Sequence, residues 1–208
     1  MKIVKYSLGQ LQANCYFLIN GQDCLIIDPA DDASFILEEL QRQQLSLVGM
    51  LATHGHFDHV MAVGEIQKSY NIPLFISKKD CFLINRMDKT AEHFLGYKSI
   101  ILPVKKIQNF PPSPRLRWAS KLKIISTPGH TPGSYCFYFK EENAVFTGDT
   151  LFKDGVGRTD LSYSNKDDLK KSLKKLFKLP EETIIYSGHG EDTMLEEENE
   201  TLQLINQL

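Results

Sequence analysis

The sequence lacks the features of a secreted or membrane-embedded chain. Its 208 residues include four scattered cysteines without a Cys-x-x-Cys pair, which favours reduced, buried thiols over a disulfide framework. No apolar run approaches the ~20 residues that a membrane-spanning helix needs. The first residues have neither the apolar stretch nor the small-residue cleavage site of a secretory signal. We therefore expect a cytoplasmic protein without a membrane partner.

The chain also lacks an excess of either charge. Lys and Arg total 24 and Asp and Glu total 26, so the net charge of −2 provides no basic field for nucleic acid. The hydrophobic fraction of 42% is ordinary for a folded globular protein. At this length we expect one core and a single domain over residues 1–208.

Short strand-like runs alternate with helical patterns. Runs rich in β-branched and aromatic residues predict strands at 2–8, 14–20, 23–28, 47–53, 73–77, 122–127, 134–140, 143–148 and 183–187. Apolar residues at helical spacing predict helices at about 33–45, from 58, and at 165–178. Thr193 and Glu196 indicate a capping box for a C-terminal helix, whereas 85–118 is weakly patterned and Pro-rich at 111–114. This alternation indicates an α/β protein with helices covering the sheets.

Residues 53–59, Thr-His-Gly-His-Phe-Asp-His, follow a predicted buried strand and precede a helix. His54 and His56 are two apart in extended chain and can point the same way. Asp58 and His59, at the start of the helix, can reach an adjacent position. Gly55 omits a side chain where the backbone must bend.

Three further ligand-type residues also follow predicted strands. They are His130, Asp149 and His189, each beside glycine or threonine. Ligands bind beyond the carboxyl ends of strands in α/β sheets, and imidazole with carboxylate suits zinc, iron or manganese. The combined set is too large for one tetrahedral zinc and suits two ions that share a bridge. His93 has no ligand-type neighbours, so we assign it no role.

This ordered set resembles the metallo-β-lactamase superfamily, and within it the glyoxalase II group of hydroxyacylglutathione hydrolases. The resemblance runs from residue 28 to residue 190. It implies an αββα sandwich, with two mixed sheets packed face to face and helices outside.

The resemblance also implies which residues hold two divalent ions, expected to be zinc, with iron or manganese as alternatives. The first ion would be held by His54, His56 and His130. The second would be held by Asp58, His59 and His189. Asp149 would bridge the ions, and Asp58 and Asp149 are the carboxylates that we assign to catalysis.

Asp28 matches an outer-shell aspartate of the superfamily, although a simple turn or cap residue would look the same. True β-lactamases of the superfamily usually carry cysteine where Asp149 stands and often arginine in place of His59. Both departures argue against lactamase activity.

The resemblance to glyoxalase II is incomplete on the substrate side. Because residue 208 comes one predicted helix after His189, we expect no helical domain of the kind that supplies glutathione contacts in glyoxalase II. Arg158 matches a basic glutathione-contacting position, but Asp160 stands where that family has an aromatic residue. A salt bridge between Arg158 and Asp160 is the alternative.

We expect hydrolysis of a small thioester such as S-lactoylglutathione, through attack by a hydroxide that bridges the metals. A thiol of pKa ~8.5 can leave as thiolate without a general acid, and no clustered histidine is spare to act as one. One alternative is a persulfide dioxygenase with a single iron held by His54, His130 and Asp149. Another is a non-catalytic metal-binding scaffold.

Replacing Asp149 with alanine should remove the shared bridge and abolish hydrolysis. The measurement is turnover of a thioester substrate by a variant whose circular dichroism shows a native fold. Wild-type-like turnover by such a variant would disprove the two-metal mechanism.

Overall fold

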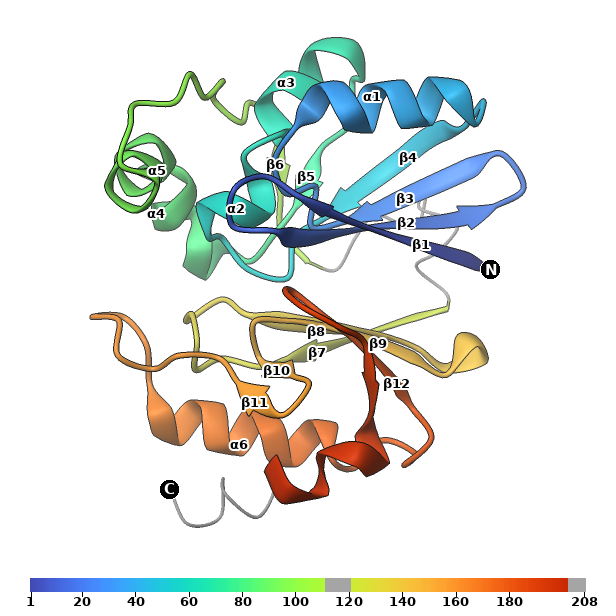
Figure 1. The fold of residues 1–208 in the computed structure, drawn as a ribbon, viewed down its shortest axis with the longest axis vertical. Coiled ribbons are helices and arrows are strands. Elements are labelled where there is room, and N and C mark those ends of the chain that lie inside the picture. Colours follow the sequence, from blue (N-terminus) through green and yellow to red (C-terminus); the bar gives the residue numbers. More distant parts are fainter. Residues whose placement is uncertain (111–120, 202–208) are drawn as a thin grey trace. The chain divides into compact units, whose positions relative to one another are not determined.

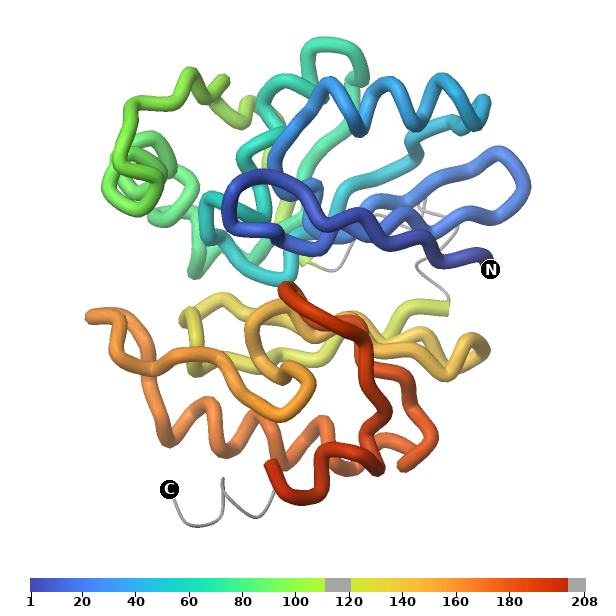
Figure 2. The backbone as a smooth tube through the Cα atoms, in the orientation of Figure 1, coloured from blue at the N-terminus to red at the C-terminus, as the bar shows by residue number. Residues whose placement is uncertain are grey.

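The computed structural model describes residues 1–110 and 121–201. The chain forms two compact units, residues 1–112 and 113–208, and Figure 2 traces the backbone through both. Each unit is described by itself below. The expectation of a single domain over residues 1–208 stays a prediction.

The first unit contains a mixed six-stranded sheet in the order β1-β2-β3-β4-β5-β6 (Figure 1). Its strands are β1 (Lys2–Leu8), β2 (Ala13–Asn20), β3 (Asp23–Ile27), β4 (Ser46–Leu51), β5 (Leu74–Phe75) and β6 (Ile107–Gln108). The first three pair antiparallel, and β3 to β6 pair parallel. The parallel strands are joined by helical segments, as crossover connections require.

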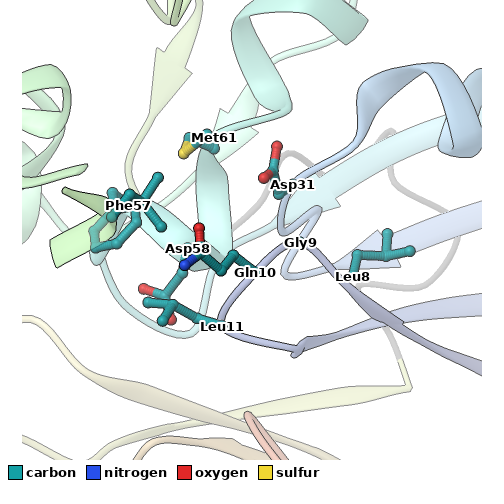
Figure 3. Close-up of a pocket in the computed structure, with 9 residues that line it drawn as sticks. Leu8, Gly9, Gln10, Leu11, Asp31, Phe57, Asp58 and Met61 are labelled. Carbon is teal, nitrogen blue, oxygen red and sulfur yellow. The ribbon is translucent and has the colours of Figure 1, made fainter. Parts of the chain in front are cut away.

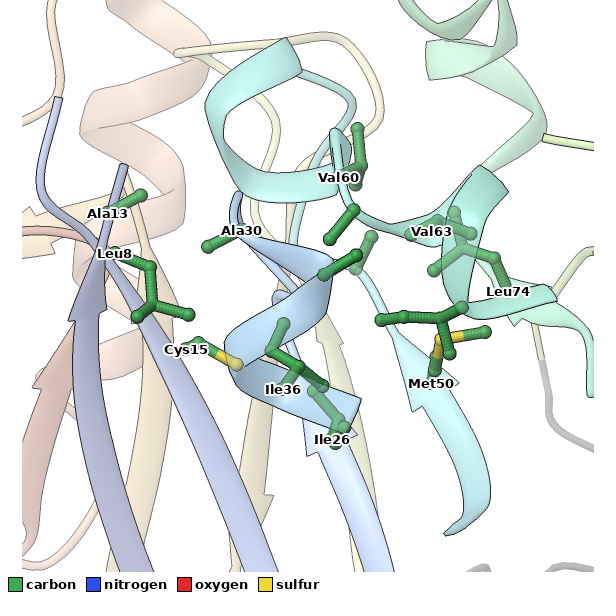
Figure 4. Close-up of a cluster of buried hydrophobic side chains, with 14 of the residues drawn as sticks. Leu8, Ala13, Cys15, Ile26, Ala30, Ile36, Met50, Val60, Val63 and Leu74 are labelled. Carbon is green, nitrogen blue, oxygen red and sulfur yellow. The ribbon is translucent and has the colours of Figure 1, made fainter. Parts of the chain in front are cut away.

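The helices of this unit are α1 (Ala33–Arg42), α2 (Phe57–Val60), α3 (Val63–Ser69), α4 (Cys81–Ile84) and α5 (Met87–Leu95). Figure 4 shows Ile36 of α1 and Val63 of α3 near the sheet residues Ile26 and Met50. All four side chains are fully buried. Burying each contributes roughly 1.5–3 kcal/mol relative to exposure, so this apolar layer attaches the helices to the sheet.

Three of the four cysteines are buried, as the sequence predicts, and Cys81 is only partly buried. All four are free thiols, and Cys15, Cys24 and Cys136 are buried. Burial raises the pKa of the Cys24 thiol to about 12, so it stays protonated near neutral pH. Cys15, Cys24 and Cys136 belong to the apolar interiors of their units.

The second unit contains a mixed five-stranded sheet in the order β13-β12-β9-β8-β7. Its strands are β7 (Leu122–Ser126), β8 (Tyr135–Phe139), β9 (Ala144–Gly148), β12 (Ile184–Ser187) and β13 (Thr193–Met194). A separate hairpin joins β10 (Leu151–Phe152) to β11 (Gly155–Val156). Only the pairing of β9 with β12 is parallel among the pairs described in this unit.

Helix α6 (Lys166–Leu176) packs on this second sheet through its predicted apolar stripe. Leu169, Leu173 and Leu176 are buried with Cys136 and Ile185 of the strands. The Asn165 side chain accepts a hydrogen bond from the N–H of Asp168 and so caps the helix.

The sequence prediction for the C-terminal end needs correction. The predicted Thr193–Glu196 capping box is wrong, because Thr193 pairs with Ile185 in the sheet and its hydroxyl lies 2.9 Å from a carboxylate oxygen of Glu198 and 3.0 Å from one of Glu197. The segment that follows is a short 3-10 helix, Leu195–Glu198. The weakly patterned region 85–118 contains α5 and β6. Its Pro-rich residues 111–114 lie outside the described part of the chain.

Among the described residues, no helix is both long enough and apolar enough to cross a bilayer. The cytoplasmic location stays a prediction.

Glu39 connects helix α1 to the edge strand β1. Its carboxylate accepts hydrogen bonds from Arg42 at 2.7 Å, from the Tyr6 hydroxyl at 2.8 Å and from Gln43 at 2.8 Å. The bonds from Arg42 and Tyr6 lower the pKa of Glu39 from 4.5 to about 2. Because the folded-state pKa is lowered, ionised Glu39 stabilises the fold above about pH 4.5, and that contribution is lost as the pH falls toward 2.

Replacing Glu39 with glutamine should lower the midpoint of thermal unfolding at pH 7 by about 2–4 °C, a shift typical of one lost polar interaction in a chain of this length. The gap between wild type and variant should narrow as the pH falls below 4.5, because wild-type Glu39 then becomes protonated. Unfolding followed by circular dichroism between pH 7 and pH 3 checks this. A gap that does not change with pH would contradict it.

Candidate metal centre

The motif 53–59 places its four predicted ligands together in the first unit. His54 and His59 are buried, and their ring centroids lie 4.3 Å apart. The His56 ring lies 4.6 Å from that of His54, and the Nε2 of His59 lies 3.7 Å from a carboxylate oxygen of Asp58. The strand β4 ends at Leu51 and helix α2 begins at Phe57, so His54 and His56 lie in the predicted strand-to-helix turn, and Asp58 and His59 lie at the start of the helix.

Asp28 holds this turn from the end of the neighbouring strand β3. Its buried carboxylate accepts hydrogen bonds from the N–H and the hydroxyl of Thr53, both at 2.7 Å. It also lies 3.1 Å from the Nδ1 of His59. Asp28 has a φ of +49°, a left-handed conformation that is strained for a residue with a side chain. These contacts support the outer-shell interpretation of Asp28 over that of a simple turn residue.

The same contacts select the tautomer of two histidines. An ionised carboxylate can only accept, so His59 donates its Nδ1–H to Asp28. The single hydroxyl hydrogen of Thr53 goes to Asp28, and its oxygen therefore accepts the Nδ1–H of His54 at 3.0 Å. Both rings then carry their lone pair on Nε2, the nitrogen that would bind a metal.

The second unit brings its three predicted ligands together at the ends of β7, β9 and β12. One carboxylate oxygen of Asp149 lies 3.5 Å from the Nε2 of His130 and 3.9 Å from the Nε2 of His189. The Nδ1 of His130 lies 3.0 Å from the backbone carbonyl of Arg158. Because a carbonyl only accepts, His130 donates from Nδ1 and carries its lone pair on Nε2.

Gly157 allows the chain to pass against this cluster. A Cβ atom at this position would lie 1.8 Å from the carbonyl oxygen of Asp149 and 3.2 Å from the Cβ of His130. No side chain fits there, so the backbone that presents the Arg158 carbonyl depends on glycine.

Arg158 and Asp160 form the salt bridge that the sequence left as an alternative. Two guanidinium nitrogens of Arg158 donate to the two carboxylate oxygens of Asp160, each at 2.7 Å. This pairing lowers the pKa of Asp160 to about 2. About half of the Arg158 side chain is exposed. A role for Arg158 in substrate binding stays a prediction.

The donor chemistry of both clusters fits divalent ions such as zinc, iron or manganese. The first unit offers three imidazoles and a carboxylate, and the second offers two imidazoles and a carboxylate. Three of these imidazoles donate their Nδ1–H to protein acceptors, as histidine ligands commonly do.

A small pocket lies beside Asp58 in the first unit (Figure 3). Its lining includes Asp31, Phe57, Met61, the last residue of β1 and residues 9–11 of the turn that follows. The volume is about 10 Å³, which is room for one water molecule. This pocket therefore does not hold a substrate as it stands.

A family model of the metallo-beta-lactamase superfamily matches residues 8–189, a span that includes every predicted ligand. The chain belongs to the metallo-β-lactamase superfamily. The predicted fold class is thereby confirmed, with a mixed sheet in each unit.

Two bacterial proteins match almost the whole length of this chain. It is 34% identical over 201 residues to "Probable metallo-hydrolase YqgX" of Bacillus subtilis (strain 168), covering 93% of this chain and 92% of that protein. It is 31% identical over 220 residues to "Hydroxyacylglutathione hydrolase GloC" of Haemophilus influenzae (strain ATCC 51907 / DSM 11121 / KW20 / Rd), covering 99% of each. The protein is therefore a metallo-hydrolase of the superfamily.

Solved structures of the superfamily agree with this result. A di-iron-bound form of TTHA1623 is 34% identical, with a TM-score of 0.86 over 95% of this chain and 98% of that one. The B3 metallo-beta-lactamase BLEG-1 is 31% identical, with a TM-score of 0.86 over 98% and 99%. ETHE1 from Myxococcus xanthus is 24% identical, with a TM-score of 0.73 over 97% and 83%, and shares the fold.

Replacing Gly157 with alanine should displace the Asp149 carbonyl and lower the thermal midpoint by several degrees, because overpacking costs about 1–3 kcal/mol. Gly155→Ala is the matched control two residues earlier in the chain, where a Cβ would meet its nearest atom at 3.9 Å. Thermal unfolding of both variants checks this. Equal midpoints for the two variants would contradict the tight packing at Gly157.

Proposed function

We propose that this superfamily member is a two-metal thioester hydrolase that acts on a small acyl-thioester such as S-lactoylglutathione. The observation that carries the proposal is the set of ligand-type side chains gathered at strand ends in each unit. In three of the histidines, hydrogen bonds orient Nε2 for metal binding. The relative GloC, named as a hydroxyacylglutathione hydrolase, supports the choice of substrate.

The proposed ligand assignment follows the family resemblance. His54, His56 and His130 would hold one ion. Asp58, His59 and His189 would hold the other. Asp149 would be shared. When bound, two such ions supply a water whose pKa is lowered toward ~7 and positive charge that stabilises a developing oxyanion. Zinc is our first choice of metal, and iron is the alternative because TTHA1623 is described in a di-iron-bound form.

The chain's own residues contribute orientation rather than proton transfer. Asp28 and Thr53 hold His54 and His59 in one tautomer, so that neither ring needs to turn when a substrate arrives. A thiolate leaving group, with a thiol pKa of ~8.5, departs without a general acid. This chemistry matches a site whose histidines are all engaged as ligands and favours a thioester over an amide.

Arg158 is the proposed contact for an anionic part of the substrate. Its guanidinium is held in a planar two-bond arrangement by Asp160 and remains half exposed. A substrate carboxylate would take the place that Asp160 occupies. The Arg158 carbonyl holds His130, so one residue would connect substrate binding to the orientation of a ligand.

A β-lactam is a second candidate substrate, because the lactamase BLEG-1 is 31% identical over nearly the whole chain. Asp149 and His59 argued against this activity at the level of sequence. The persulfide dioxygenase alternative, with iron on His54, His130 and Asp149, would leave the other four ligand-type residues without a common purpose.

The purified, metal-loaded protein should hydrolyse S-D-lactoylglutathione, measured as loss of thioester absorbance, whereas Asp149→Ala should not. Matched assays would use a chromogenic cephalosporin and glutathione persulfide with oxygen electrode detection. Hydrolysis of the cephalosporin without thioester turnover would replace the proposal with lactamase activity. Oxygen uptake with one iron per chain would replace it with dioxygenase activity.

A further inference from the structure

A second buried carboxylate, Asp80, contacts the metal-binding turn from the side opposite Asp28. Strand β4 lies between β3 and β5 in the sheet. Asp28 follows β3, whereas Asp80 ends the short 3-10 helix Lys78–Asp80 after β5. The sequence did not single out Asp80, because Ser-Lys-Lys-Asp is typical of a solvated turn.

The contact is a hydrogen bond from a backbone amide to the carboxylate. The N–H of Gly55 donates to Oδ2 of Asp80 at 2.9 Å, and Asp80 is completely buried. This N–H belongs to the peptide that joins His54 to Gly55, and the next residue is His56. The bond therefore holds the backbone midway between two proposed ligands.

The Asp80 carboxylate makes this contact although it stands where it could cap a helix. It occupies the N-cap position of α4, yet its side chain does not cap that helix. Burying a carboxylate costs several kcal/mol unless hydrogen bonds compensate, and charge-assisted bonds are stronger than neutral ones. The carboxylate is thus directed at the Gly55 amide rather than at its own helix.

The hydrogen bond between Gly55 and Asp80 also requires that residue 55 has no side chain. A Cβ atom there would lie 2.9 Å from the carbonyl oxygen of Asp80, 3.0 Å from its Cβ and 3.1 Å from the Cβ of Leu83. Glycine therefore lets the segment 80–83 approach the turn closely enough for the hydrogen bond to form.

We propose that Asp80 is a positioning residue for metal binding: its carboxylate holds the His54–Gly55 peptide so that His54 and His56 are presented in a fixed orientation. The inference rests on the proposed assignment of these two histidines as ligands. Asp28 and Asp80 then hold the turn from the two strands that flank β4. Asp28 sets the ring tautomers, and Asp80 sets the path of the backbone.

The test measures Zn²⁺ affinity by competition with a chromophoric chelator, without any substrate. Asp80→Ala should weaken Zn²⁺ binding about 10- to 100-fold, the loss typical of removing an outer-shell partner. Asp80→Asn keeps the shape and offers a neutral acceptor, so it should weaken binding about threefold to tenfold. The visible spectrum of Co²⁺-loaded Asp80→Ala should also differ from that of the wild type, because the ligand geometry has changed.

Glu39→Gln is the matched control, since it alters another buried carboxylate of the same unit that does not contact the turn. It should lower the thermal midpoint while it leaves Zn²⁺ affinity and the Co²⁺ spectrum unchanged. Should Asp80→Ala fail to fold, Asp80→Asn decides alone: affinity within twofold of the wild type would overturn the inference.

The two proposals fail in different ways. Wild-type protein that binds Zn²⁺ tightly but hydrolyses no thioester would refute the substrate and leave the role of Asp80 standing. Asp80 variants with wild-type affinity and an unchanged Co²⁺ spectrum would refute the role of Asp80 and leave the hydrolase proposal standing.

Discussion

The histidine cluster of the first unit depends on the hydrogen bonds that Asp28 accepts. One carboxylate receives the Thr53 amide, the Thr53 hydroxyl and the Nδ1–H of His59, and through Thr53 it also determines the tautomer of His54. This arrangement requires Asp28 to adopt a left-handed backbone conformation. The three hydrogen bonds that the buried carboxylate accepts offset the cost of this conformation.

In the second unit, a backbone group orients the histidine in place of a carboxylate. His130 is oriented by the carbonyl of Arg158, and that carbonyl is placed by Gly157, which packs against Asp149. A substitution at Gly157, which has no side chain to bind a metal, can therefore disturb the orientation of His130. The two halves of the proposed centre thus differ in sensitivity: the first to loss of charge at Asp28, the second to added volume at Gly157.

Local sequence patterns predicted much of the secondary structure of this protein. The strands 2–8 and 122–127 and the stripe Leu169, Leu173 and Leu176 appear within one or two residues of expectation, because alternation and helical spacing reflect burial directly. The Thr193–Glu196 pair failed because a sheet partner, Ile185, competed for Thr193. Local capping patterns carry no information about such long-range pairing.

The sequence by itself determined which residues could serve as ligands, since imidazole and carboxylate after buried strands limit the chemistry to a few metals. It also determined the superfamily, through the order and spacing of those residues. The tertiary structure alone decided which nitrogen of each oriented histidine is a donor, and that Asp80 reaches Gly55 across 25 residues of chain. Contacts of that kind depend on which strands lie side by side, and no local pattern of residues records that arrangement.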